Sequence, residues 1–146
     1  MKPLKKVLIL RFSSYGDIAI MIPVLRALSE TYPYVEFNIA SRPKMEPLFH
    51  EFTNIKFISL DIDNDYNGLN GVFKIFKVLK AFKPTHIADL HFVIRTRLIS
   101  LLFKILGHKV RSIDKGRRQK KALTRLRNKH FEPLTPTIFR YSKVFS

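Results

Sequence analysis

Short apolar runs alternate with longer amphipathic segments along most of the chain. Five short runs are typical of strands, because they are apolar or alternate apolar with polar residues: 5–11, 35–41, 55–60, 85–90 and 108–114. Between them, apolar residues three and four positions apart predict helices over 18–28, 43–50, 72–82 and 94–105. Pro84 and Gly107 follow the last two helical segments, and both residue types are common just beyond a helix end.

This alternation predicts an α/β fold. Parallel neighbouring strands need a crossover, and a helix supplies it while covering one face of the sheet. We therefore expect a parallel sheet of about five strands with helices on both faces, in a single domain over residues 1–146. The sequence has no run of about 18 apolar residues, so it predicts no helix that spans a bilayer.

The charge balance is strongly positive, with 27 lysines and arginines against 11 acidic residues and a formal net charge of +16. Such a field attracts polyanions or anionic membrane surfaces. The chain has no cysteine, which excludes disulfides and thiolate metal ligands and fits a reducing compartment. We therefore expect a cytoplasmic protein with an anionic partner.

The segment Ser-Ser-Tyr-Gly-Asp, residues 13–17, joins the first predicted strand to the first predicted helix. In open α/β sheets, ligands bind at the carboxyl ends of strands, where helix N-termini present unpaired N–H groups. Ser13 and Ser14 can donate hydrogen bonds there, and Gly16 can take a positive φ or let a ligand approach the backbone. The segment matches neither a dinucleotide-binding motif nor a Walker motif.

Asp17, the last residue of this segment, allows two interpretations. It can cap the helix by accepting amide hydrogen bonds, and on spacing alone this structural interpretation is preferred. It can also be a general base that accepts the proton of a substrate hydroxyl. The two roles are compatible, although a strongly capped carboxylate is a weaker base.

The fourth predicted strand is surrounded by further candidates. Arg95 and Arg97 follow it, at the sheet edge expected for Asp17, and could bind a phosphate, although for either one alone an ordinary surface cation is the preferred interpretation. His86 and His91 flank an aspartate, but these positions alternate between strand faces and match no metal-ligand spacing. We therefore expect no metal site.

The segment 115–129 concentrates positive charge, since eight of its fifteen residues are basic and none is acidic. A helix with these cations in solvent is the ordinary interpretation. The alternative is that Arg117, Arg118, Lys120 and Lys121 bind phosphate groups and hold the protein at an anionic surface.

Three segments together carry a family pattern: VLILRFSSYGDIAIMIPVLRALSETYP at 7–33, PTHIADLHFVIRTRLISLLFKILG at 84–107 and KGRRQKKALTR at 115–125. The first contains an S-S-x-G-D…P-x-L signature and the second a D-L-x…R pattern. In these features the chain resembles glycosyltransferase family 9, the lipopolysaccharide heptosyltransferases. The resemblance implies a GT-B architecture of two facing Rossmann-like domains, of which this chain is the N-terminal, acceptor-side half. The C-terminal donor-binding domain would then be absent.

The same resemblance implies an activity. Asp17 matches the family's catalytic base, which deprotonates an acceptor hydroxyl for inverting attack on a sugar's anomeric carbon, and Ser14 and Gly16 shape its loop. The donor would be a nucleotide-sugar such as ADP-heptose, with no cofactor. The acceptor would be an anionic lipid-linked saccharide of the lipopolysaccharide core, reached by peripheral contact with the inner membrane. Activity would need a C-terminal half, which another chain could supply.

Two other functions fit parts of the sequence. The basic segment 115–129, with Phe131, Phe139 and Tyr141 beyond it, suggests a nucleic-acid-binding module, but no recognised nucleic-acid motif accompanies it. The other alternative is a non-catalytic remnant or interaction protein.

Overall fold

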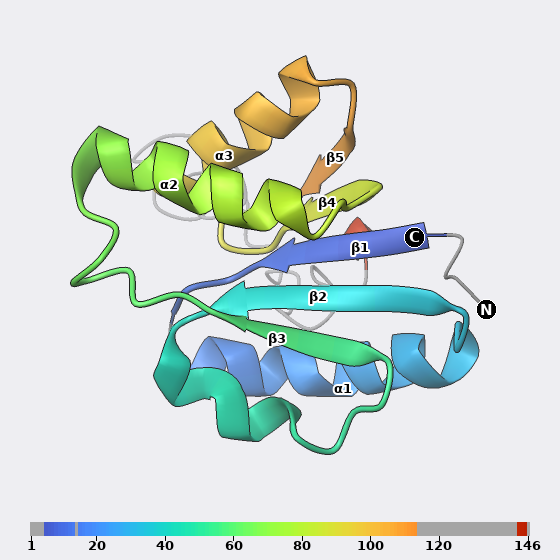
Figure 1. The fold of residues 1–146 in the computed structure, drawn as a ribbon. Coiled ribbons are helices and arrows are strands. Elements are labelled where there is room, and N and C mark those ends of the chain that lie inside the picture. Colours follow the sequence, from blue (N-terminus) through green and yellow to red (C-terminus); the bar gives the residue numbers. More distant parts are fainter. Residues whose placement is uncertain (1–4, 14, 114–142, 146) are drawn as a thin grey trace, which may run out of the picture.

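One parallel sheet forms the centre of the computed structural model, which describes residues 5–13, 15–113 and 143–145 (Figure 1). Its strands lie in the order β3-β2-β1-β4-β5, and they are β1 (Lys5–Leu10), β2 (Val35–Ser41), β3 (Ile55–Ser59), β4 (His86–Asp89) and β5 (Lys109–Ser112). All neighbouring pairs are parallel. The chain moves outward from β1 to β3 and then returns to the other side of β1. The strand order therefore reverses between β1 and β4.

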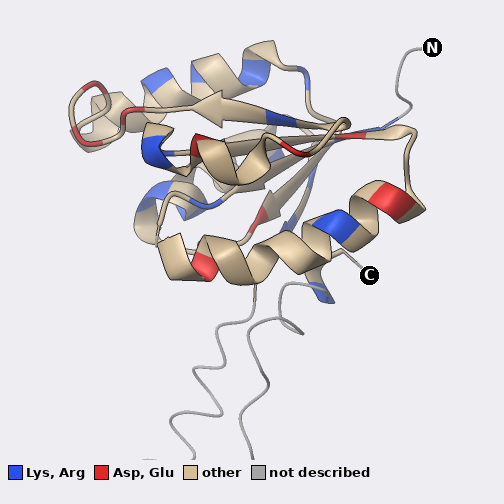
Figure 2. Cartoon of the chain, turned by 90° about the horizontal axis from the view of Figure 1, so that it is seen from below, with Lys and Arg blue, Asp and Glu red and all other residues tan. Residues whose placement is uncertain are grey.

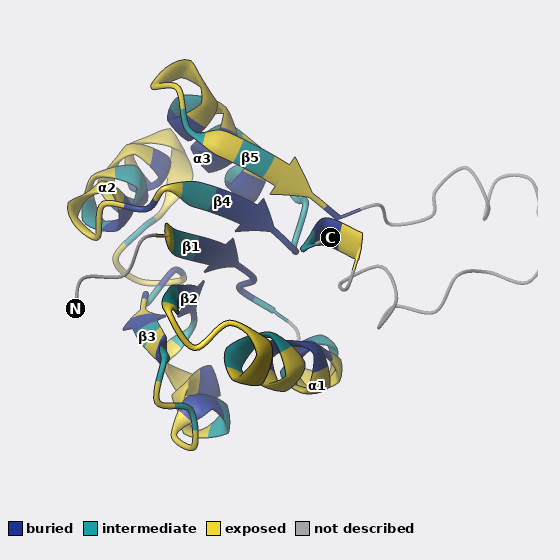
Figure 3. Ribbon diagram, turned by 90° about the vertical axis from the view of Figure 1, so that its right-hand side faces the viewer, coloured by how far each residue is buried: buried dark blue, intermediate teal, exposed yellow. Residues whose placement is uncertain are grey.

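Helices cover both faces of the sheet, as Figures 1 and 3 show. The 17-residue helix α1 (Tyr15–Thr31) and the short 3-10 helix η1 (Pro43–Phe49) lie on one face. The helices α2 (Gly68–Ala81) and α3 (Ile94–Ile105) lie side by side on the other. The predicted α/β class, with a parallel sheet of five strands, is confirmed.

The buried apolar residues form two cores, one on each face of the sheet, because successive strand side chains point to opposite faces. On β1, Ile9 joins the core under α1, whereas Leu8 and Leu10 join the core under α2 and α3. Helices α1 and α2 contribute predicted apolar positions such as Met21 and Ile75, which are fully buried. Helix α3 packs through Ile99 and Phe103 instead, whereas most of the apolar row that predicted this helix is exposed.

Several element boundaries differ from the sequence prediction. Helix α1 begins at Tyr15, three residues before the first periodic apolar residue. The apolar pattern placed this start too late, because the first turn is polar or exposed and gives no periodic signal. The segment over 43–49 is a 3-10 helix, and its internal Pro47 has no N–H to donate. Helix α3 ends ahead of Gly107, which has φ +90°, so the predicted glycine stop is confirmed.

A close approach fixes the start of α2 against the preceding loop. A Cβ at Gly71 would lie 2.3 Å from the carbonyl carbon of Tyr66, which no side chain could tolerate without movement of the backbone. The Gly71 N–H also donates to the Asn67 carbonyl at 3.1 Å. Only glycine lets α2 pack directly on the end of the loop that follows β3.

The remaining part of the chain that the structure describes is short. Val144 is buried and joins the α1-side core, with Phe145 packed against it. Within residues 5–13, 15–113 and 143–145, no helix is long and apolar enough to cross a membrane. The basic segment 115–129 and Ser14 lie outside the described residues, so the roles assigned to them stay predictions.

Candidate functional site

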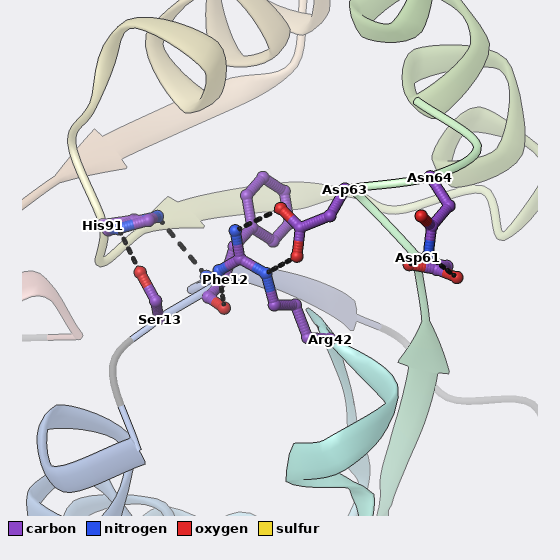
Figure 4. A network of polar contacts seen from close by, with 7 residues as sticks. All are labelled: Phe12, Ser13, Arg42, Asp61, Asp63, Asn64 and His91. Atoms are coloured by element: carbon purple, nitrogen blue, oxygen red, sulfur yellow. Dashed lines mark hydrogen bonds and ion pairs between the residues drawn. The ribbon is translucent and has the colours of Figure 1, made fainter. Parts of the chain in front are cut away.

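Polar side chains meet at the carboxyl ends of β1, β2 and β4, next to the reversal in strand order. This is the position where open α/β sheets bind ligands. Arg11, Phe12 and Ser13 follow β1, Arg42 follows β2, and His91 lies just beyond β4. Figure 4 shows most of these groups, with the acidic loop after β3 on the same edge.

Arg11 connects the start of α1 to the end of β4. Its Nη2 lies 2.8 Å from Oδ2 of Asp17, and its Nη1 donates to the Leu90 carbonyl oxygen at 2.8 Å. The Arg11 side chain is only 9% exposed, whereas that of Asp17 is 41% exposed. A buried guanidinium therefore holds a carboxylate that is partly exposed to solvent.

Asp17 itself is the third residue of α1, in the first turn. It is therefore not the N-cap residue, but its negative charge still interacts favourably with the N-terminal end of the helix dipole. Gly16 precedes it and does not have a positive φ, the first of the two possibilities for this glycine, because it is already part of the helix. An added Cβ at Gly16 would meet no atom within 4 Å, so the space for a ligand to approach remains.

His91 bridges two backbone segments of the site. Its Nδ1 accepts from the Phe12 N–H at 3.4 Å, and its Nε2 lies 3.4 Å from Oγ of Ser13. If Nδ1 is the acceptor, the neutral ring carries its proton on Nε2, which can then donate to Ser13. The Phe12 ring packs edge-on against the imidazole, with centroids 5.9 Å apart.

The position of His91 is fixed by a carboxylate within β4. Asp89 is fully buried, and its Oδ1 accepts from the backbone N–H groups of His91 at 3.1 Å and Phe92 at 2.7 Å. Phe92 takes a left-handed conformation with φ 52°, which turns the chain sharply into α3. The loop after β4 is therefore anchored to the sheet.

A second ion pair lies on the β2 side. Arg42 contacts both carboxylate oxygens of Asp63, at 3.1 and 3.2 Å, and its Nη1 donates to the Phe12 carbonyl at 2.7 Å. The pKa of Asp63 is held below its ordinary value first by the hydrogen bond and charge of Arg42, and further by the charges of Arg95 and Lys44. Arg95 therefore belongs to this positively charged group.

The structure thus brings some of the predicted site residues to the carboxyl edge of the sheet and places others elsewhere. Asp17, Ser13 and Gly16 lie on the β1–α1 connection, and Arg95 acts electrostatically on the loop after β3. Arg97 instead lies over the Phe92 ring, with its guanidinium carbon 4.9 Å from the centroid. The segment with Arg117, Arg118, Lys120 and Lys121 lies outside the described residues.

Two important residues escaped the sequence interpretation. Arg11 ends an apolar strand, a place where a cation needs a partner, and this signal could have directed attention to it. His91 was weighed only as a metal ligand, although it follows a strand at the expected ligand-binding edge. Neither partner could be identified, because the contacts join residues about 80 positions apart.

The structure is similar to those of known sugar-processing enzymes. A glycosyl transferase family 9 protein from Veillonella parvula has a TM-score of 0.67 and 18% identity, with 97% of this chain and 40% of that chain covered. The E. coli heptosyltransferase WaaC, solved with ADP, has a TM-score of 0.64 and 17% identity, with 96% and 46% covered. The expected resemblance to this family is confirmed in three dimensions.

Other enzymes share the fold. A putative UDP-N-acetylglucosamine 2-epimerase from Listeria monocytogenes has a TM-score of 0.56 and 15% identity, with 85% of this chain and 34% of that chain covered. No protein-family profile and no curated protein matches the sequence. This chain therefore has the Rossmann-like fold of the N-terminal halves of GT-B glycosyltransferases, and it spans less than half the length of those solved proteins.

Proposed function

We propose that this chain is the acceptor-side domain of an inverting glycosyltransferase of the heptosyltransferase type. The observation that carries the proposal is the half-exposed Asp17 carboxylate, held by the buried Arg11 at the carboxyl end of β1. The glycosyltransferase fold of the chain supports it. The acceptor would be an anionic lipid-linked saccharide of the lipopolysaccharide core, met at the cytoplasmic surface of the inner membrane.

In the proposed reaction Asp17 removes the proton from an acceptor hydroxyl. The freed oxygen then forms a bond to the anomeric carbon of the sugar while the bond from that carbon to the diphosphate breaks, which inverts the configuration. The diphosphate leaves with the bonding electron pair, and cations can stabilise its charge. Arg11 acts as a positioning residue, because it touches the base rather than the reacting atoms.

The other residues of the site would bind the acceptor. Ser13 and His91 provide a hydroxyl and an imidazole at the same edge of the sheet as the base, and Gly16, next to Asp17 in the chain, leaves open space. Arg42, Lys44 and Arg95 form the cationic side of the site, where a phosphate of the acceptor would bind. The donor, a nucleotide-sugar such as ADP-heptose, would be held by a separate donor-binding half.

The direct test is turnover of Asp17→Asn with a donor-binding half supplied by fusion or in trans. Transfer from the nucleotide-sugar to the lipid-linked acceptor should fall by roughly two to four orders of magnitude, the usual effect of losing a general base. Asparagine keeps the shape of aspartate and can still accept a hydrogen bond from Arg11. Equal turnover of the two proteins would contradict the assignment.

A matched control and a binding measurement separate chemistry from binding. Asp65→Asn changes an exposed acid in the loop after β3 and should keep full activity. Acceptor saccharide phosphate added to the chain alone should shift the backbone NMR signals of Ser13, Gly16 and Arg95. Shifts that avoid these residues would place the acceptor elsewhere.

A further inference from the structure

The outer side of the α2–α3 layer exposes large apolar side chains. Leu69 and Phe73 of α2 are 69% and 52% exposed, and Ile94, Leu101 and Ile105 of α3 are 78%, 52% and 71% exposed. These residues do not belong to the faces that pack on the sheet, which carry the buried residues of both helices (Figure 3). Each helix is therefore apolar on its outer side as well as on its core side.

The apolar residues of α3 form a continuous row. Ile94, Leu98, Leu101 and Ile105 are spaced by four, three and four positions, which places them above one another along one side of a helix. Three of the four are more than half exposed. A solvated helix has no need of such a row, so this side is suited to contact with an apolar partner.

The charge on the same layer is of one sign. Five exposed cations accompany the apolar residues: Lys74, Lys77, Lys80, Arg97 and Lys104. Between residues 66 and 113 the sequence has one acidic residue, Asp89, and it is fully buried under the helices. By contrast, Figure 2 shows acidic residues on α1 and on the loop after β3. The α2–α3 layer therefore presents a cationic surface with no exposed acid.

This surface borders the candidate site. Both helices begin at the carboxyl edge of the sheet, and Leu69 and Ile94 lie in their first turns. Arg95, which acts on the loop after β3, lies next to Ile94 in the chain. The exposed apolar residues thus extend from the rim of the site along the length of α3 and over the first half of α2.

We propose that the outer face of α2 and α3 is an interfacial membrane-binding face, whose partner is the surface of an anionic phospholipid bilayer. In-plane helices of this kind place aliphatic and aromatic side chains at the acyl boundary and lysines against the headgroups. The aliphatic character of the face distinguishes a bilayer from nucleic acid, whose backbone offers nothing for leucine and isoleucine to bury against. The inference does not depend on Asp17 being a catalytic base.

The charge contribution is tested with vesicle sedimentation of the full chain. Replacing Lys74, Lys77 and Lys80 by glutamine should weaken binding to phosphatidylglycerol-containing vesicles about fivefold per lysine, because each cation near an anionic surface contributes ~1 kcal/mol. The matched control replaces Lys5, Arg26 and Lys56, which are equally exposed but lie on other elements. Equal loss in the two triple variants would overturn the assignment of the face.

The apolar contribution is tested separately. Leu101→Ser with Ile105→Ser should weaken binding roughly tenfold per side chain, since each would otherwise bury apolar surface. The control pair is Ile20→Ser with Tyr34→Ser, two exposed apolar residues away from this face. If the first pair binds as well as the control pair, the attraction is purely electrostatic and the interfacial proposal is wrong.

A label reports insertion directly, and it does not depend on variants that could weaken the fold. Because the chain has no cysteine, a single Leu101→Cys carries one environment-sensitive fluorophore, and Ile20→Cys is its control. Anionic vesicles should shift the emission of the first to the blue and leave the second unchanged. The absence of an emission shift at position 101 would overturn the proposal. So would complete loss of vesicle binding on replacing only four cations of the basic segment, because the membrane contact would then lie there: Arg117, Arg118, Lys120 and Lys121.

Discussion

The two edges of the sheet organise charge in opposite ways. At the carboxyl edge, Arg11 pairs with Asp17 and Arg42 with Asp63. At the amino edge, Lys56 of β3 pairs with Glu36 of β2, but Lys5, His86 and Lys109, the first residues of β1, β4 and β5, line a groove of about 430 Å³. Side chains in paired contacts have a fixed geometry, which chemistry requires, whereas Lys5 and Lys109 contribute a positive field around His86.

The pKa shifts follow the same division. Arg42 lowers the pKa of Asp63, which favours the charged carboxylate. Burial, together with the charges of Lys5 and Lys109, lowers the pKa of His86, which favours the neutral imidazole. One edge thus stabilises charge and the other disfavours a further positive charge.

Asp89→Ala should cost about 3 kcal/mol of unfolding free energy, because it leaves two backbone N–H groups without their acceptor in a partly buried turn. Urea unfolding measures the change. The control Asp65→Ala removes an exposed acid and should shift the value by less than about 0.5 kcal/mol. Similar costs for the two variants would show that the carboxyl edge is not anchored through Asp89.

Arg11→Met should cost about 2 kcal/mol, because a buried hydrogen bond from a charged group to the Leu90 carbonyl is lost together with the ion pair to Asp17. Arg26→Met is the matched control, since Arg26 also forms an ion pair, with Glu51, but both partners are more than half exposed. The control should lose about 0–1 kcal/mol. An Arg11 variant as stable as the control would remove the distinction between a buried and a surface pair.

Acid should weaken the carboxyl edge through Asp63. Because its pKa is lower in the folded protein, the unfolded chain binds the proton first, so stability is present above the ordinary value of 3.8 and is lost as the pH falls through the folded pKa. Asp63→Asn should therefore flatten the pH dependence of urea unfolding in that window. An unchanged profile would mean that the Arg42 contact is not maintained in solution.

The smallest effect is expected at the amino edge. The pKa of His86 is lowered from 6.5, so stability should fall slightly as the pH drops below 6.5 towards the folded pKa. Lys109→Gln should raise the pKa of His86 only modestly, because burial is the larger cause. An NMR titration of His86 measures this, with Lys104→Gln as a control at a distant cation. A downward shift would contradict the proposed like-charge effect.

The sequence predicted the elements better than their contacts. All five strands and the helices were visible, because apolar residues recur on one side of each element. In α3, however, that apolar side is the exposed one. The start of α1 was missed, since Tyr15 and Gly16 are exposed and carry no periodic signal. Periodicity also gives no strand order, and the contact between Arg11 and Leu90 exists only because β4 lies beside β1.

The candidate site was predicted in position but not in detail. The rule that ligands bind at carboxyl ends of parallel strands located Ser13 and Asp17 correctly at that edge. The residues that fix them, Arg11 and His91, depend on packing between distant segments. Catalytic and acceptor-binding roles at this edge remain proposals, for which the experiments above are the tests.

Gly71 is a position in helix α2 that has no part in binding but affects the carboxyl edge of the sheet. Any side chain there would push against the backbone of Tyr66 and displace the loop that carries Asp63, the partner of Arg42. Substitutions at Gly71 should therefore be tolerated only together with compensating changes in the loop. In a library of variants selected for acceptor binding, position 71 should covary with residues 61–67, although its own atoms would never contact a ligand.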